Sequence, residues 1–137
     1  MVTSAAAEPA SYTWRLSAAQ KWGAVVGSFR GVDRTTPLDT APVTAVDRTF
    51  TASSLTLPGV TTVPPGALLV GGIGLDSSAA GIEPPSGWTE LGESSGAQAA
   101  ELASRTTTTA GPSGSATWRL PKATAVGGWL VALRPAA

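Results

Sequence analysis

The sequence predicts an all-β protein, namely an antiparallel β-sandwich of jelly-roll-like character with about eight strands and internal pseudo-symmetry. Three observations predict this class. Short segments are rich in β-branched and aromatic residues, turn-forming Gly, Pro, Ser and Asp separate them, and no long helical period is present. The 137 residues suit one domain of ordinary size, so we expect residues 1–137 to form a single β-sandwich domain.

The first two expected strands lie near the start of the sequence. Residues 11–17 alternate so that Tyr12, Trp14 and Leu16 share one face, which is the period of a half-buried strand. Residues 22–30 are richer in apolar side chains and fit a more buried strand. Six further strands are expected at residues 50–57, 67–75, 88–91, 97–106, 115–120 and 126–134. The start of the 97–106 segment has helical propensity, but its Thr-rich end favours a strand.

An internal repeat relates residues 11–30 to residues 115–134. Eight of the twenty positions are identical without a gap, which indicates one two-strand unit used twice. Trp14 and Trp118 are equivalent in the two copies, and so are Phe29 and Leu133. We therefore expect all four side chains in the core.

The charge and composition exclude several classes of function. Nine basic and nine acidic residues balance, and only 13% of residues are charged, so we expect neither a nucleic-acid nor a membrane partner. The absence of Cys and His removes disulfides, thiol nucleophiles and the commonest general base and zinc ligand. The first residues lack the basic and apolar regions of a signal peptide. The longest apolar run, residues 64–75, is shorter than the ~20 residues of a transmembrane helix.

Candidate catalytic and metal-binding residues are few. Glu90, Glu93 and Glu101 could supply a carboxylate pair for glycoside hydrolysis, and Glu90 shares a strand face with Trp88, but nothing in the sequence separates them from solvated surface charges. The glycines of residues 71–74 lack the helix of a phosphate loop. We therefore expect no enzyme activity, no cofactor and no metal. Asp33, Asp39, Asp47 and Asp76 could supply oxygen ligands for calcium, but their spacings do not match an EF-hand, and turn hydrogen bonding is the preferred interpretation. Lys21 and Lys122 are interpreted as solubilising charges.

Two tryptophans are candidate contact residues. Trp22 and Trp129 are not equivalent to each other in the repeat, since each aligns with a valine. Tryptophan can anchor a protein interface or stack on a sugar ring. We therefore expect Trp22 and Trp129 to be exposed anchors for a partner or a ligand.

Several strand and turn motifs resemble one family. They occupy residues 8–14, 27–33, 37–39, 65–70, 85–89 and 130–135. Together they resemble the duplicated β-sandwich modules of bacteriophage minor structural and tail proteins and of large actinobacterial proteins. The resemblance implies that residues 1–40 are the remnant of a first half-repeat, residues 41–47 a connector and residues 48–137 a second half-repeat.

The resemblance implies a non-enzymatic structural or assembly protein, a capsid-decorating or tail component of a virion or an extracellular assembly. Because first-half strands would be missing, we expect open sheet edges covered by a second copy or by another virion protein. A self-sufficient sandwich is the alternative on this point. The alternative function is a carbohydrate-binding or receptor-adhesion module that holds a glycan through exposed tryptophan.

Overall fold

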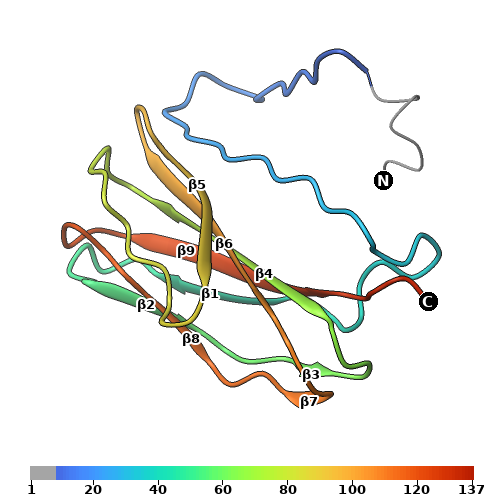
Figure 1. Cartoon of the computed structure of the whole chain (residues 1–137). Coiled ribbons are helices and arrows are strands. Elements are labelled where there is room, and N and C mark those ends of the chain that lie inside the picture. Colours follow the sequence, from blue (N-terminus) through green and yellow to red (C-terminus); the bar gives the residue numbers. More distant parts are fainter. Residues whose placement is uncertain (1–8) are drawn as a thin grey trace.

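The computed structural model describes residues 9–137, which contain nine strands and no helix (Figure 1). The all-β class expected from the sequence is therefore confirmed. The strands are β1 (Val43–Asp47), β2 (Ser54–Leu57), β3 (Thr61–Thr62), β4 (Leu68–Leu75), β5 (Thr89–Ser95), β6 (Ala99–Thr106), β7 (Gly111–Pro112), β8 (Ala116–Arg119) and β9 (Val126–Leu133).

Most strands belong to one long antiparallel ribbon that is folded over on itself. Strand β1 pairs with β9, β2 with β8, β3 with β7, and β4 with β6. Residues 43–75 form one side of the ribbon and residues 99–133 the other. The same register continues through all four pairs, with a shift of one residue between the first three pairs and the β4-β6 pair. Strand β4 also pairs with β9, which closes the folded ribbon. This nested pairing is the arrangement of a jelly roll.

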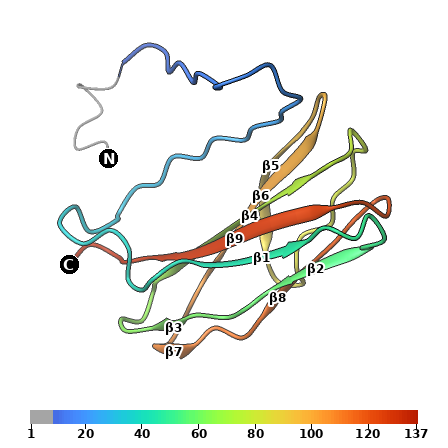
Figure 2. The ribbon, with the colours of Figure 1, turned by 180° about the vertical axis from the view of Figure 1, so that it is seen from behind.

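The folded ribbon makes two layers (Figures 1 and 2). One layer is a five-stranded sheet in the order β1-β9-β4-β6-β5. The other contains the pairs β2-β8 and β3-β7, and Glu83 extends it by bridging to Arg119 of β8. We call the side of the five-stranded sheet that faces the β2-β8 pair its inner face, and the opposite side its outer face.

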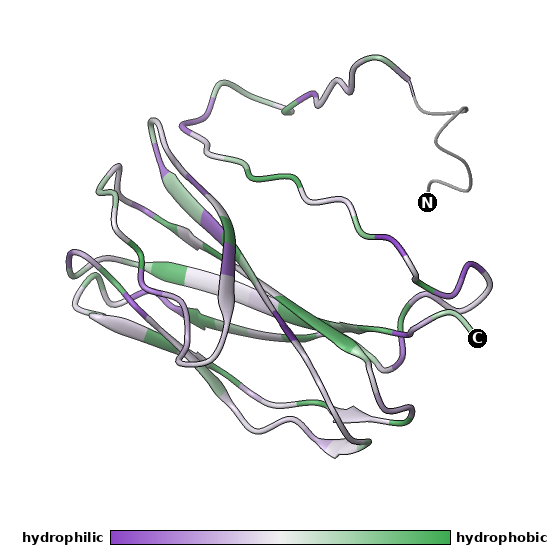
Figure 3. Cartoon of the chain, in the orientation of Figure 1, coloured by the Kyte–Doolittle hydropathy of each residue, from purple (hydrophilic) through white to green (hydrophobic). Residues whose placement is uncertain are grey.

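Tryptophan packed on glycine forms the centre of the core between the layers. The ring of Trp118, from β8, lies so close to Gly71 of β4 that a Cβ atom at Gly71 would overlap it. Trp88 meets Trp118 edge to face, with ring centroids 5.5 Å apart. Figure 3 shows the hydrophobic stretches in the strands of both layers. The remaining core is mostly aliphatic and includes Leu55, Leu57, Leu69, Ile73, Leu75, Val126 and Leu130.

The described N-terminal residues differ from the prediction, because residues 11–17 and 22–30 form no strand. We call residues 9–30 the arm. It runs along the outer side of the five-stranded sheet, away from the β2-β8 layer (Figures 1 and 2). Val25 contacts Gly92, and Gly27 lies against Leu102, so the arm crosses the outer face over β5 and β6. The repeat therefore folds as strands only in its second copy.

Other expected boundaries also change. Residues 41–47, expected as a connector, contain strand β1. The strand expected at residues 50–57 begins only at Ser54, and Phe50 lies outside it with a φ of 60°. The strand expected at residues 88–91 becomes the longer β5.

A buried carboxylate holds the segment that follows the arm. Asp39 lies 3.0 Å from Arg134, measured from Oδ1 to Nη2, and its side chain is fully buried. Its Oδ2 accepts a hydrogen bond of 2.7 Å from the backbone N–H of Val63. Val32 forms a bridge with Pro135 nearby. These contacts hold the segment after the arm against the end of β9.

A second buried carboxylate lies on the inner face. Glu101 of β6 is 2% exposed, and neither carboxylate oxygen makes a well-aligned hydrogen bond in the described part of the chain. Burial raises the pKa of Glu101 to about 7, the indole of Trp118 opposes the rise, and the carboxylates of Glu90 and Glu93 add to it. The folded protein therefore favours the protonated form of this side chain.

We predict that the Glu101→Gln variant removes one component of the pH dependence of stability. The folded-state pKa of about 7 exceeds the ordinary glutamate pKa of 4.5, so the stability linked to protonated Glu101 is complete below pH 4.5 and is lost as the pH rises to 7. The loss is roughly 3 kcal/mol. Urea denaturation between pH 4 and pH 8 should show a smaller decline for the variant than for the wild type.

The matched control is Glu83→Gln, because Glu83 is exposed and does not contribute to the shift at Glu101. This control should keep the wild-type pH dependence. Equal declines in wild type and Glu101→Gln would show that Glu101 is not held protonated in the fold.

Candidate functional site

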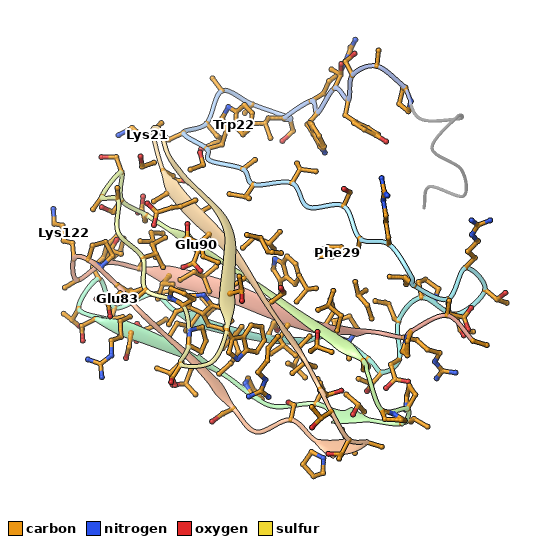
Figure 4. The ribbon with its side chains drawn as sticks, in the orientation of Figure 1. Lys21, Trp22, Phe29, Glu83, Glu90 and Lys122 are labelled. Carbon is orange, nitrogen blue, oxygen red and sulfur yellow. The ribbon has the colours of Figure 1, made fainter. Side chains whose placement is uncertain are left out.

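The arm is the most exposed apolar segment that the structure describes. Tyr12, Trp14, Leu16, Trp22 and Val26 each have more than half of their surface exposed. Tyr12 and Trp14 pack against each other with ring centroids 5.9 Å apart. Figure 4 shows Trp22 on the arm at the end of the molecule near β5. Contiguous exposed apolar surface of this kind is typical of an interaction site.

The two copies of the repeat have opposite environments. Trp118 is 0% exposed in β8, whereas the equivalent Trp14 is 63% exposed in the arm. The prediction that Trp14 lies in the core is therefore wrong. The residues around Trp14 join no sheet in the described part of the chain, so no facing layer buries the indole. The other two expected core residues, Phe29 and Leu133, are half-buried. Phe29 lies on the arm segment that faces the sheet (Figure 4).

A second apolar surface surrounds the edge of the five-stranded sheet at β1. Val46 is 60% exposed, Phe50 is 59% exposed and Trp129 is 41% exposed. In the sheet register Trp129 lies opposite Thr44, and Val46 lies opposite Gly127, so Trp129 and Val46 share the outer face. Trp129 covers Gly72, where any Cβ atom would overlap the indole. We call Val46, Phe50 and Trp129 the β1 patch.

The other sequence-predicted anchor, Trp22, lies at an open groove. The groove lies between the arm and the turns that follow β4 and β5, with a volume of about 820 Å³. Polar side chains accompany the indole, and Gln98 donates a hydrogen bond of 2.9 Å to Asp76 at its floor. Its lining residues are Ala19, Gln20, Lys21, Trp22, Asp76, Ala97 and Gln98. The structure thus separates Trp22 and Trp129 into two different surfaces.

The three candidate carboxylates share the inner face near β5. Glu93 is directly opposite Glu101 in the register, and Glu90 is opposite Ala103. The Glu93 carboxylate accepts hydrogen bonds from the backbone N–H groups of Gly81 and Ile82, at 2.7 to 3.1 Å. Glu93 therefore holds the loop between β4 and β5 against the sheet. Glu90 is exposed, and Glu101 is buried.

The aspartates serve separate parts of the chain. Hydrogen bonds from the Thr36 and Thr35 backbones lower the pKa of Asp33, and those from Thr49 lower the pKa of Asp47. Asp39 belongs to the buried ion pair and Asp76 to the groove. Among residues 9–137, no group of three or more acidic side chains is arranged to hold a metal ion. Lys21 and Lys122 are both exposed, one on the arm and one in the turn before β9 (Figure 4).

Sequence reasoning found Trp129 of the β1 patch but missed Val46 and Phe50. Residues 43–46 alternate between outer and inner positions, but this segment is short and does not alternate between apolar and polar residues, because Val46 occupies an outer position. Phe50 was interpreted as the start of a strand, and nothing in the sequence indicates its positive φ.

Within the described residues there is also no helix that is long and apolar enough to cross a membrane.

Comparison with known proteins provides no relative from which a role could be transferred. No family model, no curated protein and no solved structure matches this chain. The functional inference therefore rests on the arm, the β1 patch and the Trp22 groove.

Proposed function

We propose that this protein is a non-enzymatic structural module that assembles with copies of itself, or with other structural proteins, through its arm. The proposed setting is a virion or a phage-like particle, in which the module is a capsid-decorating or tail component. The setting is supported by the resemblance of the sequence motifs to bacteriophage structural modules. Association is supported by the surfaces described above.

One observation carries the proposal. The arm repeats the β8-β9 segment at eight of twenty positions, yet Trp14 and Val26 are exposed where the equivalent Trp118 and Leu130 are buried. Burying apolar surface contributes about 25 cal/mol per Å², so several exposed aromatic and aliphatic side chains provide a large driving force for association. The even balance of charge adds no net repulsion between copies.

We predict that replacing the apolar row of the arm abolishes association. The variant Tyr12→Ser/Trp14→Ser/Leu16→Ser, here called the arm variant, removes the exposed row without touching the buried core. Sedimentation velocity should show wild-type species heavier than the 13.7 kDa monomer at micromolar concentration, and only monomer for the arm variant.

The control for this experiment is Val63→Ser, which removes an exposed apolar side chain outside the arm and should leave association unchanged. Circular dichroism should be the same for all three proteins. A wild type that remains monomeric at about 100 μM would contradict assembly with copies of itself, because the arm would then have no counterpart in the protein itself.

The groove at Trp22 favours a second candidate function, the holding of a glycan. An indole beside planar polar groups, here Gln20, Asp76 and Gln98, is an arrangement suited to stacking and hydrogen bonding with a sugar. Under this alternative the module is a carbohydrate-binding or receptor-adhesion domain.

For the second candidate, the Trp22→Ala variant should lose at least tenfold in affinity for whichever glycans the wild type retains on an array. Phe50→Ala is the matched control, because it removes an equally exposed aromatic side chain away from the groove. Retention of no glycan by the wild type, or equal retention by Trp22→Ala, would exclude this candidate.

A further inference from the structure

We propose that residues 11–16 of one copy add as an extra strand to the free edge of β1 in a second copy. The inference rests on the proposed function and names the partner and the place at which the arm binds. It depends on three features of the described residues: a strand-forming segment outside any sheet, an unprotected sheet edge and a match between the side chains of the two.

A segment of similar sequence to residues 11–16 forms a strand in this fold. Its counterpart, residues 115–120, contains β8, which pairs with β2 residue by residue from Ala116 to Arg119. Trp14 and Arg15 are identical in type to Trp118 and Arg119. Within its own chain, however, the arm leaves the sheet over β5 and β6, and residues 11–16 enter no strand. The same local sequence thus has a partner strand in one copy of the repeat only.

The two edges of the five-stranded sheet are protected to different degrees. The β5 edge carries the charged residues Glu90 and Glu93, with a register shift between Glu90 and Gly92. Charges and bulges are the devices that prevent an edge strand from pairing with another chain. Strand β1 pairs on one side only, with β9, in a regular register. Its residues 43–46 contain no charge, no bulge and no proline.

The surroundings of β1 fit an apolar strand. A strand added beside β1 would bring its outward side chains within about 5 Å of those of Thr44 and Val46. The row of Tyr12, Trp14 and Leu16 would then continue the apolar surface formed by Val46 and Trp129. The positive φ of Phe50, unusual for an aromatic residue, lies in the turn directly after β1. Backbone strain of this kind is often found at functional sites.

The charges on the opposite face are complementary. In β1, Asp47 alternates with Val46 and therefore faces the other way. In the arm, Arg15 alternates in the same manner with Trp14 and Leu16. When the aromatic row of the arm shares the outer face with Val46, Arg15 shares the face of Asp47. An arm from a second copy would thus place its apolar row beside Val46 on the outer face and Arg15 on the same face as Asp47.

Two complementary variants test the pairing. The edge variant, Thr44→Lys/Val46→Lys, introduces two charges on exposed side chains of β1, and the arm variant described above lacks the apolar row. We expect each variant alone to associate at least tenfold more weakly than the wild type in sedimentation velocity. An equimolar mixture should form a one-to-one complex of twice the monomer mass, because one copy supplies an intact arm and the other an intact edge.

The control is Val63→Lys, which places a charge on an exposed apolar position away from β1 and should associate as the wild type does. If the doubly charged variant fails to fold by circular dichroism, the single variant Thr44→Lys carries the same prediction. Wild-type association by the edge variant, or a mixture that remains monomeric, would overturn the edge pairing and leave the proposed function in place. A monomeric wild type would overturn both the edge pairing and assembly of the protein with copies of itself.

Discussion

The nested antiparallel ribbon, in which residues 43–75 pair with residues 99–133, is the constraint on which the rest of the structure depends. Because side chains alternate along every strand, this register decides which residues face the β2-β8 layer. It places Trp118 over Gly71, and a change of one residue in register would turn the core side chains of a strand outward. The pairing of β4 with β9 then closes the two layers around that core.

The closed ribbon leaves the arm without a place in the sheet. Strand β9 already has neighbours on both sides, and β8 occupies the position beside β2 that the sequence of the arm would suit. The β5 edge carries Glu90 and Glu93 and an irregular register, whereas the β1 edge is regular and carries no charge from Val43 to Val46. An exposed strand-forming segment and an open edge in one molecule are the two halves of an interface, which is the physical basis of the assembly that we propose.

The fold class and most of the strands could be predicted from the sequence, because residues such as those of β4, β6, β8 and β9 combine β propensity with apolar periodicity. The state of the arm could not, since the same residues are buried at Trp118 and exposed at Trp14. Tertiary context alone separates these two environments. For the candidate site, the exposure of Trp22 and Trp129 could be predicted from their asymmetric positions in the repeat. The free edge at β1 could not be predicted, because it depends on the order of the strands in the sheet.

Hydrogen exchange at the backbone amides of Trp14, Arg15 and Leu16 tests the central claim most directly. In the full chain below the concentration of association, these amides should exchange rapidly, because they belong to no strand in a single copy. Above that concentration the account predicts at least tenfold slower exchange at these amides, together with protection of the β1 edge at residues 43–47. Rapid exchange of the arm amides in the fully associated protein would contradict it.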